Sequence, residues 1–184
     1  MFGVAALVVL SGCSAGEPEY GYSVPAKICD VGVDEPDVKP LLPPGEEMKA
    51  TDVEVGEKSG EHRSCRLVVD KKIGLAVSIA RDSEVDDVME FGVDEYVDFR
   101  KVSLGGAVTS AGVGDDGAAA WMKCRPKDGQ PQSEMYGYPY NHLVLKVHVG
   151  GAEGAGGDEV QERRVDLENF MRSYVSGVRD IWCE

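Results

Sequence analysis

Hydrophobic and polar residues alternate through much of the middle of the chain, a pattern that predicts β-strands with one buried face. The alternation is cleanest over residues 143–149 and looser over residues 48–55. Residues 65–70 and 75–80 are also strand-like, and they flank the segment Lys71-Lys72-Ile73-Gly74. Because a glycine suits a tight turn, we expect these two segments to form a hairpin.

A further pair of strands is expected at residues 102–109 and 118–125. The segment between them contains Gly112, Gly114 and Gly117, which satisfy the spacing G-x-G-x-x-G of dinucleotide-binding loops. Such a loop leads into a long helix, whereas a strand-like segment follows here, and neighbouring aspartates would repel a pyrophosphate. We therefore interpret this segment as a hairpin turn and expect no nucleotide cofactor.

The end of the chain has the periodicity of a helix. Between residues 166 and 182, apolar side chains recur at steps of three and four, at Leu167, Phe170, Met171, Tyr174, Val178 and Ile181. The glycine-rich residues 150–158 before it predict a loop. A short helix is expected at 83–91, beginning at Ser83 and ending before Gly92, and a turn or two around Leu41. The predicted fold class is α+β, an antiparallel sheet with a long C-terminal helix packed on one face.

The first residues predict export. Phe2 to Leu10 form an uncharged apolar run of nine residues, too short to span a bilayer but long enough for the apolar part of a signal peptide. The following Leu10-Ser11-Gly12-Cys13 resembles the bacterial lipobox, which implies cleavage after Gly12 and a lipid on Cys13. Residues 1–3 lack the positive charge with which a signal peptide begins, so the start could lie upstream. The alternative to a signal peptide is that this apolar run forms a buried N-terminal strand.

The cysteines agree with an exported protein. Cys13 apart, four cysteines are spread along the chain without any C-x-x-C spacing, which predicts two disulfides. Of the three pairings, we predict Cys29–Cys65, tying the opening segment to the first hairpin, and Cys124–Cys183, clamping the closing helix to a strand. The expected organisation is a signal peptide at 1–12, a flexible tether at 13–27 and one α+β domain at 28–184.

Charge excludes one class of partner. The chain has 33 acidic and 19 basic residues, a net charge of −14, which disfavours binding to nucleic acid. The same charge disfavours adsorption to anionic lipid, so the expected contact with the membrane is the lipid on Cys13. We expect the protein at the extracytoplasmic face of the membrane.

Candidate catalytic and metal-binding residues are sparse. His62 and Cys65 have an H-x-x-C spacing, but a zinc site needs three or four ligands and an oxidised cysteine is not one. The pairs Asp86-Asp87 and Asp115-Asp116 would act as acid and base only if burial separated their pKa values. We expect no metal and no catalytic centre, and interpret the protein as a binding module. The alternatives are a cell-envelope hydrolase that uses carboxylates or His142, and an accessory subunit of a membrane complex.

One segment suits ligand binding. Tyr136, Tyr138, Tyr140 and His142 follow one another at alternate positions just before the strand at 143–149. Tyrosines offer rigid apolar area with a polar tip, which suits peptides and glycans. The alternative is a turn whose rings cover the edge of the next strand. An envelope protein, a peptide or a glycan are the partners considered.

Several markers together resemble a known group of proteins. They are Ile28-Cys29, Leu41-Leu42-Pro43-Pro44-Gly45, the run from Ser64 to Asp70, Trp121-Met122-Lys123-Cys124, and the run from Asp166 to Tyr174 that leads to Cys183. In their order they are similar to a family of uncharacterised secreted lipoproteins of actinobacteria. The resemblance covers residues 29–183 and implies an extracytoplasmic lipoprotein, with no catalytic residues carried over.

Overall fold

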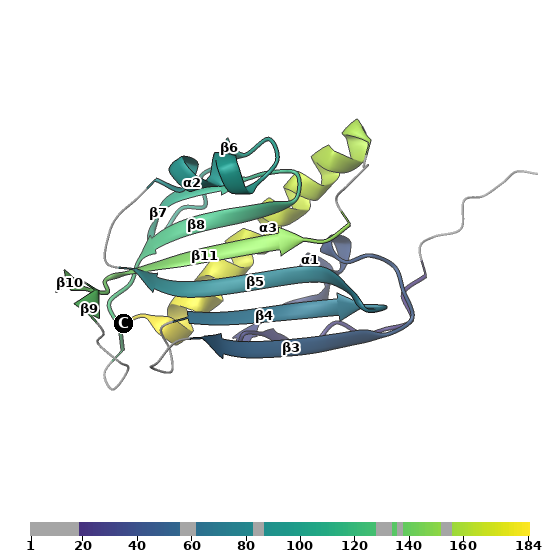
Figure 1. Ribbon diagram of the computed structural model, residues 1–184, viewed down its shortest axis with the longest axis horizontal. Helices are drawn as coiled ribbons and strands as arrows, with labels where there is room; N and C mark the ends of the chain where they lie inside the picture. Colours follow the sequence, from purple (N-terminus) through teal and green to yellow (C-terminus); the bar gives the residue numbers. More distant parts are fainter. Residues whose placement is uncertain (1–18, 56–61, 83–86, 128–133, 136–137, 152–155) are drawn as a thin grey trace, which may run out of the picture.

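A seven-stranded antiparallel sheet forms the centre of the molecule (Figure 1). The computed structural model describes residues 19–55, 62–82, 87–127, 134–135, 138–151 and 156–184. In spatial order the strands are β3 (Met48–Val55), β4 (His62–Val69), β5 (Lys72–Asp82), β11 (His142–Val149), β8 (Gly117–Lys123), β7 (Val108–Val113) and β6 (Arg100–Lys101). The last long strand in sequence, β11, therefore lies in the middle and pairs with β5 and β8.

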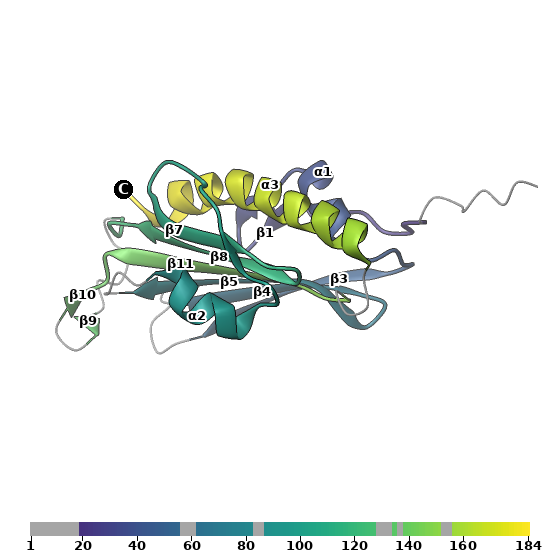
Figure 2. The ribbon, with the colours of Figure 1, turned by 90° about the horizontal axis from the view of Figure 1, so that it is seen from above.

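Helices lie on both faces of this sheet, as Figure 2 shows. The long helix α3 (Gly157–Trp182) crosses one face, where the short α1 (Glu35–Val38) lies beside it. The 3-10 turn η1 (Lys39–Leu41) also contacts α3. The short helix α2 (Val88–Glu95) lies on the other face. The predicted fold class, an antiparallel sheet with a long C-terminal helix on one face, is confirmed. No helix in the described part of the chain is both long enough and apolar enough to cross a membrane.

Alternation along the strands divides the core in two. In β11, Leu143, Leu145 and Val147 point into the main core below α3, whereas Val144 joins a smaller cluster below α2. The predicted stripe on α3 is buried except at its end, where Ile181 is exposed and Trp182 is buried. The buried residues of α3 are Leu167, Phe170, Met171, Tyr174, Val178 and Trp182.

Some predicted boundaries were wrong for identifiable reasons. The turn between β4 and β5 uses Asp70 and Lys71, with φ of 46° and 71°, and not Gly74, which lies inside β5. Aspartate tolerates this left-handed conformation, and its carboxylate is held by the backbone N–H groups of Glu46 (3.1 Å) and Glu47 (3.0 Å). Helix α3 begins at Gly157, so part of the predicted loop at 150–158 is helical.

The helix on the α2 face also differs from the prediction. It begins after Asp87, whose carboxylate accepts the Met89 N–H at 3.1 Å, and continues past Gly92 to Glu95. Gly92 does not end the helix; it makes room for the Phe99 ring, which a Cβ at this position would meet at 2.2 Å. The predicted start at Ser83 lies outside the described residues.

The glycine-rich segment at 112–117 is a hairpin turn, as predicted, but the strand before it, β7, runs from Val108 to Val113 and not over 102–109. Gly112 lies in β7, Gly114 in the turn and Gly117 at the start of β8. The strand β8, and not a helix, comes directly after the turn, so the arrangement differs from a dinucleotide-binding loop.

Both predicted disulfides are present, Cys29–Cys65 and Cys124–Cys183. The first joins β4 to a small hairpin, β1 (Lys27–Ile28) and β2 (Val31–Gly32), that packs against α3. Contacts with the domain begin before residue 28: the Gly21 N–H donates to the Gly45 carbonyl at 2.8 Å, and the Tyr22 hydroxyl donates to the Pro43 carbonyl. The predicted signal peptide and Cys13 lie outside the described residues.

Candidate functional site

Three segments far apart in sequence meet at one end of the sheet. They are the end of β8, the start of β11 and the end of α3, near the C-terminus marked in Figure 1. The Cys124–Cys183 disulfide joins the first and third segments. The Cys124 N–H donates to the Asn141 carbonyl at 2.8 Å, and the Glu184 N–H donates to the Arg125 carbonyl at 2.9 Å. These bonds hold the backbone of all three segments in a fixed relation.

A cavity of about 610 Å³ lies among these segments. Its size falls within the range of about 300–1,000 Å³ that is usual for small-molecule sites. The lining residues are Ala107, Lys123, Cys124, Arg125, Pro126, Tyr140, Asn141, His142, Arg179 and Glu184.

His142 is a buried polar residue of this lining. Its side chain is 5 % exposed, and neither ring nitrogen hydrogen-bonds to a residue within the described ranges. Burial lowers the pKa of His142 below its ordinary value of 6.5, and the nearby positive charge of Lys123 lowers it further, against a smaller opposing effect of Asp82. The ring is therefore neutral at pH 7, with one nitrogen as donor and the other as acceptor. A buried group with this capacity unused costs about 1–3 kcal/mol.

Positive side chains surround the same cavity. Lys123 is the register partner of His142 across β8 and β11, Arg125 follows the end of β8, and Arg179 lies on the last turn of α3. None of the three forms an ion pair with any residue that the structure describes. Against them, the described lining includes one acidic side chain, that of Glu184. The cavity is thus locally cationic in a chain whose net charge is −14.

The predicted ligand segment contributes two of its four residues to this lining. Tyr140 and His142 both line the cavity, together with Asn141 between them. Tyr136 lies outside the described residues, and Tyr138 belongs to a two-residue strand, β10 (Tyr138–Pro139), which pairs with β9 (Glu134–Met135). The basic residues of the cavity were not predicted, because only the strand pairing and the disulfide bring their segments together.

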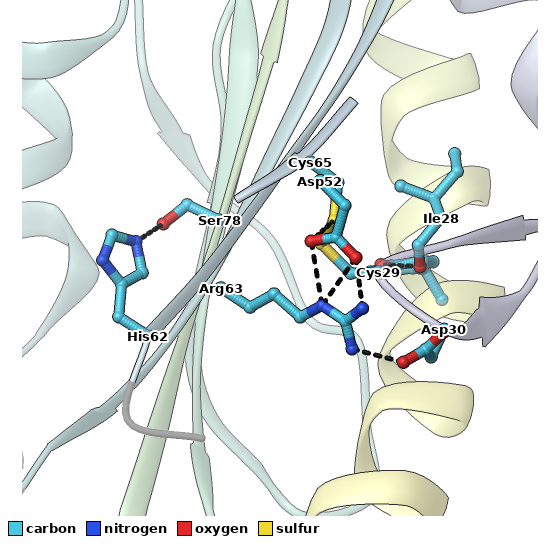
Figure 3. The surroundings of a disulfide bond; sticks show 9 residues. Ile28, Cys29, Asp30, Asp52, His62, Arg63, Cys65 and Ser78 are labelled. Carbon is cyan, nitrogen blue, oxygen red and sulfur yellow. Dashed lines mark hydrogen bonds and ion pairs between the residues drawn. A yellow bond between two sulfur atoms is a disulfide. The ribbon is translucent and has the colours of Figure 1, made fainter. Parts of the chain in front are cut away.

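A second polar cluster surrounds the Cys29–Cys65 disulfide (Figure 3). The Arg63 guanidinium donates to both carboxylate oxygens of Asp52 on the neighbouring strand, with Nε 3.0 Å from each, and to Asp30 in the turn of the β1–β2 hairpin. These bonds, above all those that Asp52 accepts, raise the pKa of Arg63 above its already high value. The cluster fastens the hairpin to the sheet edge, since Arg63 bridges β3, β4 and the hairpin turn.

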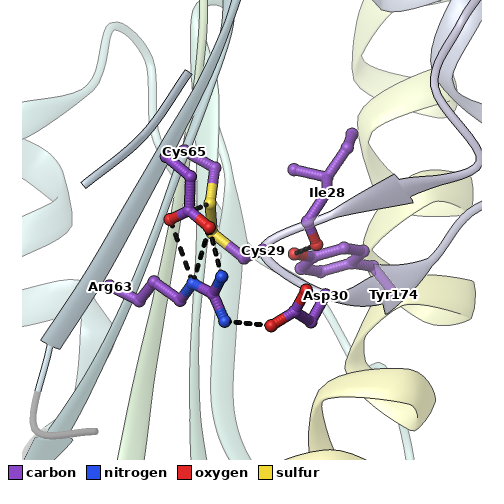
Figure 4. Close-up of polar contacts among 7 residues, drawn as sticks. Ile28, Cys29, Asp30, Arg63, Cys65 and Tyr174 are labelled. Carbon is purple, nitrogen blue, oxygen red and sulfur yellow. Dashed lines mark hydrogen bonds and ion pairs between the residues drawn. A yellow bond between two sulfur atoms is a disulfide. The ribbon is translucent and has the colours of Figure 1, made fainter. Parts of the chain in front are cut away.

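The same hairpin is bonded to α3, as Figure 4 shows. The Tyr174 hydroxyl donates to the Ile28 carbonyl at 2.7 Å in a buried position. Burial raises the pKa of Tyr174 well above 10, so its phenol stays protonated as a donor. The hairpin is therefore held by a disulfide, an ion-pair cluster and a buried hydrogen bond.

The one metal-like grouping among the described residues is Cys29, Asp52 and Cys65, whose ligand atoms lie within 4.8 Å of one another. The two sulfurs are bonded to each other, and the carboxylate is bound by Arg63, so the group does not suit a metal ion. His62 does not join it: its Nε2 lies 2.8 Å from the Ser78 hydroxyl oxygen (Figure 3). The H-x-x-C spacing of His62 and Cys65 thus does not assemble a zinc site.

Asp86 lies outside the described residues, and the remaining candidates that the structure describes have structural partners. His148 Nε2 lies 3.1 Å from a Glu95 carboxylate oxygen, and its ring stacks on Tyr96 at 4.7 Å between centroids. Asp87 accepts a hydrogen bond from the Ser110 hydroxyl at 2.5 Å, which with its other bonds lowers the pKa of Asp87 to about 2. Asp115 forms an ion pair with Arg164 on α3.

Comparisons with family models, with curated proteins and with solved structures find no match to this chain, so its site is interpreted from geometry alone.

Proposed function

We propose that the protein is a lipid-anchored, non-catalytic binding module, and that it holds a small ligand in the cavity between β8, β11 and the end of α3. The observation that carries this proposal is the buried His142, whose ring nitrogens are unpartnered among the described residues while its ring lines that cavity. A ligand that hydrogen-bonds to the ring would remove the cost of leaving it unsatisfied.

Binding is favoured over catalysis by what surrounds the ring. A histidine that acts as a general base is oriented by a second group and lies within hydrogen-bond reach of the group that it deprotonates. Within the part of the chain that the structure describes, no carboxylate or hydroxyl is bonded to His142. The frame around it is rigid, because a disulfide and two backbone hydrogen bonds fix the lining segments.

Two observations support the proposed location outside the cytoplasm. Two disulfides are typical of proteins that fold in an oxidising compartment outside the cytoplasm. The lipobox-like Leu10-Ser11-Gly12-Cys13 and the resemblance to secreted actinobacterial lipoproteins agree with a lipid on Cys13. Diacylation there would give stable anchoring, which a single acyl chain does not.

The ligand proposal is tested on the oxidised domain with a panel of small molecules that includes neutral sugars, amides and carboxylates. Binding is followed by the NMR signal of the His142 ring. A saturable shift with at least one class, lost in an Ala107→Trp variant that fills the cavity, is expected. If no member of the panel shifts the signal at millimolar concentration, the proposal is wrong.

The anchoring proposal is tested in an exporting bacterial host. Intact mass of the processed protein should show a lipid adduct on Cys13, and the Cys13→Ala variant should be released from the membrane. Wild-type protein recovered unmodified and soluble would contradict it.

A further inference from the structure

The residues that line the cavity indicate the chemistry of its ligand. Resting on the proposed function, we infer that the ligand has a compact anionic group, a carboxylate or a phosphate, joined to an uncharged body. The anionic group is bound between Arg125, Arg179 and Lys123, and the body contacts Tyr140 and Pro126. The inference begins from these three cations, which line one concave site and have no ion pair with a described residue.

Cations without an ion pair to a described residue also occur elsewhere on the surface, for example Lys71 and Lys72 in the exposed β4–β5 hairpin, where they need no ligand to explain them. The three around the cavity differ because they come from separate segments and line a single hollow. The lining has these three cations against one carboxylate, that of Glu184, and a concave site with an excess of one sign of charge focuses its field on the space inside it. A positive field in this one hollow of a chain with 33 acidic residues indicates that the ligand is anionic.

The Cys124–Cys183 disulfide and a backbone hydrogen bond hold the backbone segments that carry the two arginines. Arg125 follows Cys124 in sequence, and the Arg179 carbonyl accepts the Cys183 N–H at 2.9 Å. The Cys124–Cys183 disulfide therefore fixes the distance between the two segments that bear the guanidinium groups. Guanidinium groups bind carboxylates and phosphates through paired N–H bonds, and a fixed spacing lowers the entropy cost of binding.

His142 adds a neutral hydrogen bond beside these charges. Burial, with a smaller effect of the Lys123 charge, lowers the pKa of His142 and favours the neutral ring, so one nitrogen can donate to an oxygen of the ligand and the other can accept from a hydroxyl or amide. Because His142 and Lys123 are register partners on adjacent strands, the same oxygen-bearing end of a ligand lies within reach of both. The uncharged part is then directed toward the aromatic and proline side of the lining, Tyr140 and Pro126.

The experiment uses the oxidised wild-type domain and four probes with one common ring: benzoate, phenyl phosphate, the neutral benzamide and the cationic benzylamine. Affinities are measured by NMR titration at low salt and again at 0.5 M salt. We expect benzoate or phenyl phosphate to bind at least about tenfold more tightly than benzamide, since charge-assisted hydrogen bonds are about twice as strong as neutral ones. The advantage of the anion should shrink at high salt.

Single substitutions of the basic residues test where the anionic probe binds. Arg179→Gln and Arg125→Gln each replace an exposed side chain, and each should weaken binding of the anionic probe about fivefold to tenfold while binding of benzamide stays unchanged. Lys72→Gln is the matched control: it removes the same charge from the hairpin away from the cavity and should leave the affinity unchanged. Thermal unfolding of each variant verifies that it is folded.

The outcomes separate the two proposals. Preference for benzoate identifies a carboxylate and preference for phenyl phosphate identifies a phosphate; both support the inference. If benzamide or benzylamine binds as tightly as the anions, or if Lys72→Gln weakens anion binding as much as the arginine variants, the inference is overturned while the binding function stands. If no probe, charged or neutral, binds saturably, the inference is overturned, and the binding function is decided by the wider panel of sugars, amides and carboxylates.

Discussion

Replacing Tyr174 with phenylalanine removes one buried hydrogen bond and leaves the packing of α3 intact. The Tyr174 side chain is 1 % exposed, and its ring stacks on Phe170 with 4.9 Å between centroids. Phenylalanine keeps this stacking and loses only the 2.7 Å bond to the Ile28 carbonyl. The change therefore isolates the link between the C-terminal helix and the first hairpin.

The expected loss of stability follows from burial. A hydrogen bond contributes about 0.5–1.5 kcal/mol net, but leaving a buried acceptor without a donor costs about 1–3 kcal/mol. We expect Tyr174→Phe to lower the free energy of unfolding by about 2 kcal/mol, within this range. For a domain of this size each kcal/mol lowers Tm by about 2–4 °C, so Tm should fall by about 4–8 °C.

Urea unfolding followed by tryptophan fluorescence measures the effect, because Trp182 ends the same helix. The slope of free energy against urea should be unchanged, since the surface exposed on unfolding is the same. Tyr20→Phe is the matched control: the Tyr20 hydroxyl has no hydrogen bond to a described residue, so its removal should change stability by less than about 0.5 kcal/mol. Equal stabilities of the two variants would refute the reasoning.

Three further predictions concern other parts of the domain. Replacing Cys124 and Cys183 by alanine opens a loop of 59 residues and should lower the free energy of unfolding in urea by about 4 kcal/mol. Asp87→Asn should flatten the pH dependence of Tm at acid pH. In the wild type the lowered pKa of Asp87, about 2, gives stability that is present above about pH 4 and is lost as the pH falls toward 2. Gly92→Ala should destabilise by about 1–3 kcal/mol, because the new Cβ would meet the Phe99 ring at 2.2 Å.

Each of these has a control on the same structure. Gly156→Ala adds a Cβ with no heavy atom within 4 Å and should be tolerated; a similar loss at Gly92 and Gly156 would contradict the packing argument. Asp94→Asn changes an exposed carboxylate of the same helix as Asp87 and should leave the acid dependence of Tm as in the wild type. If the variant without the Cys124–Cys183 bond matched the wild type in urea, the loop-closure argument would fail.

Elements with strong periodicity could be predicted from the sequence. The alternation of residues 143–149 predicts a strand, and the stripe from Leu167 to Val178 predicts a helix with one buried face; both are present. The first turns of α3 were missed because residues 157–165 are mostly charged and follow a glycine run, so they lack an apolar stripe. The β4–β5 turn was misplaced because Asp70 and Lys71 adopt the left-handed conformation that favours glycine.

The candidate site could be predicted only in part, for a reason of topology. Tyr140 and His142 are marked by local composition, and both line the cavity. Lys123, Arg125 and Arg179 carry no local signal, since they meet His142 only because β11 pairs with β8 and a disulfide joins β8 to α3. Sequence separation hides such convergence, because each segment alone has the composition of an ordinary surface.

The pairing of consecutive cysteines has a consequence for the order of oxidation. Cys29 bonds to the next cysteine, Cys65, and Cys124 bonds to the one after it, Cys183, so the two loops do not interleave. A chain that emerges from its N-terminus presents each native pair in turn, and simple sequential oxidation yields both bonds without reshuffling by an isomerase. The lipid proposed on Cys13 would remove a thiol that emerges before Cys29 and would compete for it.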